Sequence, residues 1–209
     1  MKQAPDRQPL PPTDVSRETD ERLDAFAALF LEWNRRINLV SAKDAAGLRE
    51  RHIADSLQLL PLLPPAAAPV LDLGSGGGFP GLVLAAAAPN RAIHLVEADK
   101  RKAAFLTTAA ARLGLGQVTV HAMRAEALTM PGVPVMTARA FAPLRHIVPL
   151  AQRFLAVDGV AILPKGRGAE DELADALADG WTLRVERFIS RTDPHSTIFR
   201  IARPDRAGP

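Results

Sequence analysis

The chain has 209 residues, 47% of them hydrophobic, which is enough to bury one core in a single domain with a short extension. It contains no cysteine, which excludes disulfides and thiolate metal sites and favours a cytoplasmic protein. The net charge of +3 permits a polyanionic partner without requiring one. No apolar run approaches the roughly 18 residues that predict a membrane span, so we expect no membrane association.

The N-terminal third is expected to precede the main domain. Residues 1–18 are rich in proline and charge, lack the apolar core of a signal peptide, and should form a flexible segment. Apolar residues at helical spacing predict a helix over 19–37 and a second helical stretch over 47–63. The proline- and alanine-rich run 64–69 is typical of a linker. Residues 19–69 are therefore predicted to be a helical extension and linker.

Strand and helix patterns alternate through the rest of the chain. Seven strands are expected at 70–74, 92–97, 117–121, 133–138, 160–163, 182–189 and 197–201. Helices are expected at 80–88, 99–112 (with Asp99 as the cap), 144–155 and 169–178. Helices between strands imply parallel pairing, whereas the last two strands are too close for a helix and should form an antiparallel hairpin. We predict an α/β domain over 70–203, with the seven-stranded, mostly parallel sheet of Rossmann-like class I S-adenosylmethionine (SAM)-dependent methyltransferases.

Two cofactor motifs overlap in the stretch L-D-L-G-S-G-G-G-F-P-G, residues 71–81. From Asp72 it reads D-x-G-x-G-x-G, typical of SAM sites, and from Gly76 it reads G-x-G-x-x-G, typical of dinucleotide sites. In both, glycines such as Gly74 and Gly76 let a ligand approach the backbone at a helix N-terminus. Glu97, after the second strand, is placed to accept hydrogen bonds from both ribose hydroxyls in either case. Glu97 therefore does not discriminate between the cofactors.

Asp72 favours SAM. A dinucleotide-binding fold normally keeps an apolar residue at this place in the first strand, because a buried charge is costly. In a SAM site an acid here can orient the loop or the methionine amino group. The alternative is a buried carboxylate that the loop amides satisfy. An NAD(P)-dependent oxidoreductase remains open on the loop alone.

A longer series of motifs goes beyond the fold. It comprises W-N-R-R-I-N-L-V-S (33–41), R-H-I-A-D-S-L (51–57), D-L-G-S-G-G-G-F-P-G (72–81), L-V-E-A-D-K-R-K-A-A-F-L (95–106), R-A-E (124–126), T-A-R-A-F-A-P-L (137–144) and L-P-K-G (163–166). In this order the motifs resemble the bacterial ribosomal RNA small subunit methyltransferase G family, also called glucose-inhibited division protein B, over about Trp33 to Arg200. One departure is V-P-V at 133–135, where the family usually has an acidic residue before T-A-R-A. This departure makes the exact bounds of the fourth strand less well defined by the resemblance, but it leaves the match around the strand intact.

The resemblance implies a SAM-dependent enzyme that methylates guanine N7 in 16S rRNA of the small ribosomal subunit. It also implies a SAM pocket formed by the backbone near Gly74, Phe79, the pair Ala125 and Glu126, and Arg139. Each side chain has a plainer alternative. Phe79 could fill the core, Glu126 could be a solvated acid, and Arg139 could form an ion pair internal to the fold rather than bind a carboxylate.

The residues themselves also limit the chemistry. Methylation of pyrimidine C5 commonly requires a cysteine, and adenine amines are usually handled by an N-P-P-[YF]-like turn where this chain has A-R-A-F at 138–141. Guanine N7 carries an unprotonated lone pair, so alignment with the methyl group and exclusion of water suffice, and we expect no catalytic general base. Because N7 faces the deep groove of A-form RNA, the target should lie in a loop or be flipped out. No histidine set has metal-ligand spacing, so no metal is expected.

RNA contacts are predicted first for Lys100, Arg101 and Lys102, because a helix dipole disfavours cations in the first turn. A solvated turn neutralised by Glu97 and Asp99 is the alternative. Further candidates are Lys165, Arg167 and the pair Arg35 and Arg36. His52 and Asp55 share a helix face and are expected to pair with each other, or else to line the site.

The sequence favours a monomeric enzyme. The rival functions are a small-molecule methyltransferase and a noncatalytic RNA-binding module with the same fold, besides the oxidoreductase.

Overall fold

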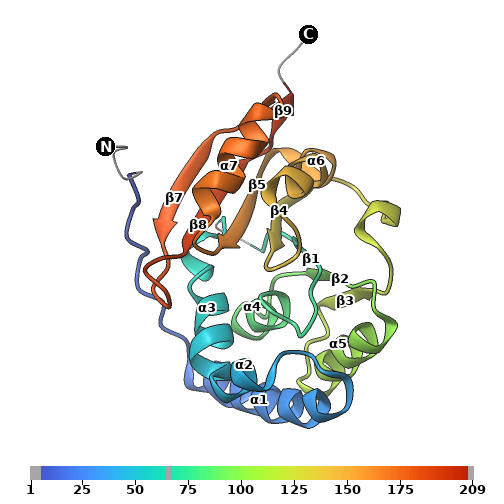
Figure 1. Ribbon diagram of the computed structural model, residues 1–209. Coiled ribbons are helices and arrows are strands. Elements are labelled where there is room, and N and C mark those ends of the chain that lie inside the picture. The colour runs from blue at the N-terminus through green and yellow to red at the C-terminus, as the bar shows by residue number, and fades with distance from the viewer. Residues whose placement is uncertain (1–5, 65–66, 207–209) are drawn as a thin grey trace.

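The computed structural model describes residues 6–64 and 67–206, and its centre is a seven-stranded sheet (Figure 1). The strands lie in the order β3-β2-β1-β4-β5-β8-β7. Their bounds are β1 Val70–Leu73, β2 Ile93–Val96, β3 Val118–His121, β4 Val133–Ala138, β5 Leu155–Lys165, β7 Val185–Ile189 and β8 Thr197–Ala202. Strands β1 to β5 pair in parallel, and β8 is antiparallel to both β5 and β7. The predicted mostly parallel sheet with a terminal antiparallel hairpin is confirmed.

Two strand predictions differ from the structure, at 160–163 and at 182–189. The strand expected at 160–163 is longer, because β5 runs from Leu155 to Lys165. The strand expected at 182–189 is divided, because Trp181–Thr182 (β6) pairs instead with Asp205–Arg206 (β9) in a separate two-stranded sheet. The pairing of β4 with β5 shifts register between Val133 and Val135. Pro134 lies between them and has no N–H to donate to the ladder. The irregularity therefore falls at the place where the V-P-V stretch departs from the expected pattern.

Seven α-helices and three short helical turns accompany the strands in the described residues. The α-helices are α1 Arg17–Ile37, α2 Ala42–Ala46, α3 Ala54–Leu57, α4 Gly81–Ala87, α5 Lys100–Arg112, α6 Leu144–Phe154 and α7 Ala169–Ala178, and the turns are Arg49–Ile53, Leu60–Leu62 and Ala125–Ala127. The Asp99 side chain caps α5 as predicted, accepting hydrogen bonds from the N–H groups of Arg101 and Lys102. The single helical stretch expected over 47–63 is instead a series of short helical pieces. None of the helices in 6–64 or 67–206 is long and apolar enough to cross a membrane.

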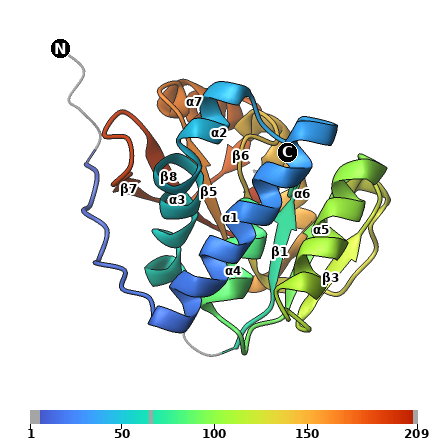
Figure 2. The same cartoon turned by 90° about the horizontal axis from the view of Figure 1, so that it is seen from below.

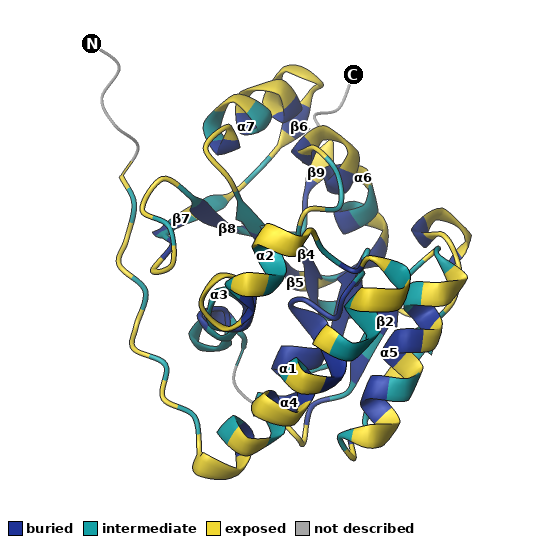
Figure 3. Ribbon diagram, turned by 60° about the horizontal axis from the view of Figure 1, so that its bottom comes forward, coloured by how far each residue is buried: buried dark blue, intermediate teal, exposed yellow. Residues whose placement is uncertain are grey.

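Helices cover both faces of the sheet and create two hydrophobic clusters. On one face α1 packs across α4 and α5, and Phe26, Phe30 and Phe105 are fully or almost fully buried there (Figure 2). On the other face α6 and α7 contribute Ile147 and Leu173. Figure 3 shows the outer faces of α1 and α5 exposed and their inner faces buried. The N-terminal helical extension therefore shares a core with the sheet domain.

The segment before α1 lies along the edge of the sheet. The Gln8 N–H donates to the Arg187 carbonyl at 2.8 Å, and the Ile189 N–H donates to the Gln8 carbonyl at 3.0 Å, both in β7 (Figure 1). The Arg7 guanidinium donates to the Pro194 carbonyl at 3.3 Å. The flexible segment predicted over 1–18 includes residues 1–5, which lie outside the described residues, and Gln8, which bridges Phe188 in strand β7. Covering an edge strand removes a template for unwanted strand pairing.

Candidate cofactor and acceptor pockets

A pocket of about 490 Å³ opens where β1, β2 and β4 end at the carboxyl edge of the sheet. Six of the predicted cofactor-binding residues line it, namely Gly74, Gly76, Phe79, Glu97, Ala125 and Arg139. Leu39, Val40 and His52 close it from the N-terminal extension. Ligands of open α/β sheets bind at this edge, because the loops that follow the strands carry side-chain and backbone polar groups there. We call this the cofactor pocket.

The loop after β1 requires glycine. Gly74, Gly76 and Gly78 have φ angles of 67°, 51° and 90°, in the left-handed region that side chains rarely tolerate. A Cβ atom on Gly81 would lie 2.2 Å from Leu95 Cδ2 and 2.7 Å from an Asp72 carboxylate oxygen. The loop can therefore turn tightly and begin α4 close under the sheet.

Asp72, in strand β1, holds this loop through a hydrogen bond to its backbone. Its carboxylate is fully buried and accepts hydrogen bonds from the Gly81 N–H at 3.2 Å and the Thr137 hydroxyl at 2.9 Å. Burial raises the pKa of Asp72 to about 6, against the hydrogen bonds that favour its charged form. Asp72 is not among the residues that line the cofactor pocket. The structure thus matches the alternative of a satisfied buried carboxylate rather than contact with a methionine amino group.

Glu97 closes the loop from the neighbouring strand. One carboxylate oxygen accepts from the Gly76 N–H and the other from the Asp99 N–H, each at 2.8 Å. Each oxygen of a carboxylate has a second lone pair, so both can still accept from a ligand hydroxyl. The residue predicted to bind ribose is held rigidly at the pocket wall.

Phe79 combines both predicted roles. Its side chain is buried in an aromatic cluster, with its ring centroid 5.5 Å from that of Phe26 and 5.3 Å from that of Phe30. It also lines the cofactor pocket and stacks on His52 at 5.0 Å. The aromatic ring therefore joins the N-terminal extension to the glycine loop.

Arg139 is held at all three guanidinium nitrogens by one short segment of the extension. Its Nε donates to Asp55 at 2.8 Å, one terminal nitrogen lies 2.9 Å from His52 Nδ1, and the other donates to the Arg51 carbonyl at 3.2 Å. His52 and Asp55 were expected to pair with each other. Instead both bind Arg139, and the internal ion pair considered for Arg139 is present beside its position in the cofactor pocket.

The contact with Arg139 fixes the protonation of His52. A guanidinium has no acceptor, so His52 Nδ1 must carry the lone pair and Nε2 the proton. Burial, and next the charge of Arg139, lower the pKa of His52, which favours the neutral ring. Its Nε2 is buried without a hydrogen-bond partner within the described part of the chain. His52 is thus a neutral donor and not a free base.

Ala125 and Glu126 are adjacent in the chain but line different cavities. Ala125 is buried and lines the cofactor pocket. The Glu126 side chain is exposed, forms a 3.4 Å ion pair with Arg124, and faces a neighbouring cavity rather than the cofactor pocket. Any contact of residue 126 with a ligand in the cofactor pocket would therefore come from its backbone.

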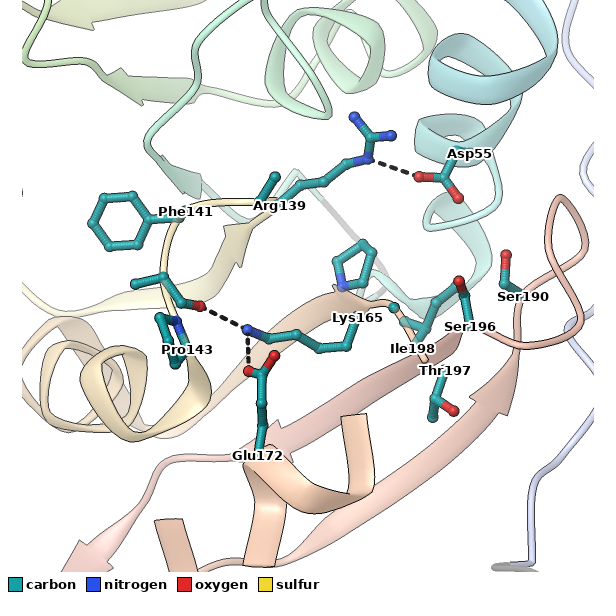
Figure 4. A pocket seen from close by; sticks show the side chains of 14 residues that line it. Asp55, Arg139, Phe141, Pro143, Lys165, Glu172, Ser190, Ser196, Thr197 and Ile198 are labelled. Atoms are coloured by element: carbon teal, nitrogen blue, oxygen red, sulfur yellow. Dashed lines mark hydrogen bonds and ion pairs between the residues drawn. The ribbon is translucent and has the colours of Figure 1, made fainter. Parts of the chain in front are cut away.

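A second pocket of about 530 Å³ adjoins the first (Figure 4). The two pockets share the wall formed by Arg139, Ala140 and Phe141, in the turn after β4. Ala140 has a φ of 51°, and the Phe141 ring occupies the space that a Cβ on Gly74 would need. We call this second cavity the acceptor pocket. The sequence analysis did not identify Phe141 or Ala140 as site residues, although the A-R-A-F turn pointed to this loop.

Lys165 is an internal cation in this structure. Its side chain is 8% exposed, and its ammonium donates to the Ala142 carbonyl at 2.7 Å and to Glu172 at 2.8 Å (Figure 4). The sequence predicted Lys165 as a further candidate for RNA contact, and in the structure its ammonium is bound within the protein. Glu172 was not predicted, because nothing in the helical pattern of α7 distinguishes it from the neighbouring acids.

The remaining predicted RNA contacts are divided. Lys100 and Arg101 are exposed at the start of α5, with Arg101 in a 3.3 Å ion pair with Asp99, whereas Lys102 lines the cofactor pocket. Arg167 is exposed in the loop after β5. Arg35 and Arg36 are exposed at the end of α1, and Arg36 pairs with Glu32 at 3.4 Å. Groups of three or more residues suited to hold a metal do not occur in 6–64 or 67–206.

Known proteins match the chain along most of its length. A family model described as rRNA small subunit methyltransferase G matches residues 19–190. Proteins named ribosomal RNA small subunit methyltransferase G from Acidiphilium cryptum and Granulibacter bethesdensis are 53% and 52% identical; the alignments cover 93% and 90% of this chain and 95% and 86% of the relatives.

Solved structures share the fold. A variant of MtNAS in complex with SAM superposes with a TM-score of 0.59 at 16% identity, over 89% of this chain and 76% of that one. The ribosomal protein L11 methylase of Lactobacillus delbrueckii gives 0.54 at 16% identity, over 74% and 77%. Similarity at this level supports the fold alone.

Proposed function

Because this chain belongs to the rRNA small subunit methyltransferase G family, it is a SAM-dependent rRNA methyltransferase, and we propose that its acceptor is guanine N7 in 16S rRNA. The observation that carries the proposal is the family match over residues 19–190, which contain the whole lining of the cofactor pocket, the loop shared by the two pockets and most of the lining of the acceptor pocket. SAM supplies an activated methyl group when it is bound.

The cofactor pocket fits SAM residue by residue. We propose that Glu97 accepts the ribose hydroxyls and that Ala125, with the backbone of Glu126, borders the adenine. The glycine loop at Gly74 and Gly76 leaves room for the backbone to contact the ligand. The remaining end of the pocket holds Arg139, whose guanidinium suits a carboxylate.

Transfer to N7 needs no proton acceptor. The N7 lone pair forms a bond to the methyl carbon as the bond from that carbon to sulfur breaks, and the positive charge passes to the purine. His52 Nδ1 is occupied by Arg139, so it is not available as a base. The role of the protein is to align the two groups and exclude water, which lowers the entropic part of the barrier. We therefore propose no catalytic general base.

For the RNA we propose contacts at the exposed cations Lys100, Arg101 and Arg167. Lys100 and Arg101 begin α5, the helix that also brings Lys102 into the wall of the cofactor pocket. We further propose that the enzyme acts as a monomer on the small subunit in the cytoplasm, where its substrate is made.

The choice of cofactor has a direct test. Calorimetric titration of the purified protein with SAM should give a saturable heat, whereas NAD(P) should give none. Saturable binding of NAD(P) without binding of SAM would contradict the proposal and support a dinucleotide-dependent enzyme.

A further inference from the structure

We propose that the acceptor pocket binds the target guanine and that the Glu172 carboxylate selects guanine by accepting hydrogen bonds from its N1–H and N2–H groups. This inference rests on the proposed function. It adds a specificity-determining residue in α7, a helix far along the chain from the glycine loop.

The position of the acceptor pocket suits a base that receives a methyl group. Its wall toward the cofactor pocket consists of Arg139, Ala140 and Phe141 and is common to both cavities. Its volume of about 530 Å³ is in the range of small-molecule sites. Phe141 and Pro164 offer apolar surfaces for a flat ring, as pockets for flipped bases do. A base in this pocket has one edge at the shared wall.

The way Arg139 is held keeps N7 reactive. A free arginine beside guanine pairs with O6 and N7, which would occupy the lone pair that has to attack the methyl group. Here Asp55, His52 and the Arg51 carbonyl take all three guanidinium nitrogens. Asp55 itself is fixed by the Thr192 hydroxyl at 2.8 Å and by Gln58 at 2.7 Å. These contacts use three of the five N–H groups and fix the guanidinium plane, so Arg139 cannot turn freely to pair with O6 and N7.

Glu172 has one oxygen committed and one open. Oε2 accepts from the Leu144 N–H and from Lys165, each at 2.8 Å. Oε1 accepts no hydrogen bond within residues 6–64 and 67–206, and the side chain is 33% exposed at the pocket. The Lys165 ammonium and the Leu144 N–H at the start of α6 hold the carboxylate in place. The Glu172 carboxylate is therefore held in place with Oε1 free, so it can accept hydrogen bonds from donor groups on a base.

Among the four bases, guanine alone presents two adjacent donors on its Watson–Crick edge. Adenine presents a ring acceptor at N1, which a carboxylate repels. In guanine the 2-amino group and N7 lie at opposite ends of the purine. Figure 4 shows Glu172 and Arg139 on opposite sides of the pocket. With N7 at the shared wall, the donor edge points toward Glu172.

The test compares guanosine with inosine, which lacks the 2-amino group, at the mapped target of reconstituted small subunits. The wild-type enzyme should prefer guanosine by about 10- to 100-fold in kcat/KM, the range for a hydrogen bond to a charged group. Glu172→Gln should reduce this preference to about 5-fold or less while retaining SAM binding in a parallel titration. A role in holding the loop alone would lower both rates equally.

Glu170→Gln is the matched control. Glu170 lies on the same helix, pairs with Arg187 at 3.1 Å and is not among the residues of the acceptor pocket, so its variant should keep the wild-type preference. A Glu172→Gln enzyme with the wild-type preference for guanosine would overturn the assignment of Glu172 only. If the wild-type enzyme methylated neither substrate, the proposed function would fail with it.

Discussion

Among individual residues, Glu97 has two tasks that one carboxylate can perform together. Its oxygens accept from the N–H groups of Gly76 and Asp99, and their remaining lone pairs face the cofactor pocket wall. Replacement by glutamine would remove the charge and place an amide donor against a backbone N–H. The loop, and the ribose site proposed for this carboxylate, would each lose an acceptor.

Glu97→Gln should therefore weaken SAM binding by about 1.5 to 3 kcal/mol, the cost of losing charge-assisted hydrogen bonds. Calorimetric titration measures this directly. Glu126→Gln is the control and should bind SAM like the wild-type enzyme, because the Glu126 side chain is exposed outside the cofactor pocket. Equal affinity of the Glu97 variant and the wild type would show that Glu97 is not at the ribose.

Asp72 gives the fold a pH dependence with a definite sign. Its pKa is raised from 3.8 to about 6 because burial disfavours the charged form. Between these two values the folded state binds more protons than the unfolded state, so this group makes the protein less stable as the pH rises. The loss of folding stability caused by Asp72 is nearly complete by about pH 7. It amounts to about 3 kcal/mol, at 1.36 kcal/mol for each pKa unit of the shift.

Asp72→Asn, which cannot ionise, isolates this effect from other titrating groups. In urea unfolding, the stability of the wild type relative to the variant should fall by about 2.4 kcal/mol from pH 4 to pH 7, because a small part of the effect is already present at pH 4. The same relative stability at both pH values would show that Asp72 has an ordinary pKa in the folded protein.

Among secondary-structure elements, the start of α5 borders the cofactor pocket and carries two of the proposed RNA contacts. Lys102 lines the cofactor pocket, whereas Lys100 and Arg101 are exposed beside it. Cations at a helix N-terminus oppose the helix dipole, so helix stability does not explain them. The two exposed residues can be changed without touching the pocket.

Changing Lys100→Gln and Arg101→Gln together should make the salt dependence of RNA binding shallower by about 1.5 in the log–log slope, as expected for two lost phosphate contacts. SAM affinity should stay unchanged. The control changes Arg17→Gln and Arg112→Gln, two exposed arginines at the start of α1 and the far end of α5, and should leave the slope as it is. If changing Lys100 and Arg101 left the slope unaltered, these two residues would be solvated charges that do not contact the RNA.

Local sequence patterns predicted the elements well where one physical cause dominates. The capping of α5 by Asp99 and the buried parallel strands follow from neighbours in the chain. The change of helix type within 47–63 does not, because spacing at 3.6 residues per turn predicts a helical face and not where the hydrogen-bond pattern changes. Arg139 is bound by Asp55 and His52, which lie 84 and 87 positions away in the sequence. Local sequence spacing carries no information about contacts over such distances.

Across the whole molecule, the N-terminal extension is part of the site. Phe26 and Phe30 pack on Phe79 of the glycine loop, and residues 51–55 hold Arg139 in the wall between the pockets. Gln8 bridges Phe188 in β7, and the loop that follows β7 contributes Ser190 and Ser196 to the acceptor pocket. The extension and the sheet domain therefore share both a core and a site.

The central claim is transfer of the SAM methyl group to guanine N7 of 16S rRNA. The most direct measurement incubates the protein and radiolabelled SAM with small subunits from cells that lack the enzyme, and then maps the labelled nucleotide by chain cleavage specific for 7-methylguanosine. We expect label at one guanine, at N7. Label on another atom or another base, or no label from an enzyme that binds SAM normally, would contradict it.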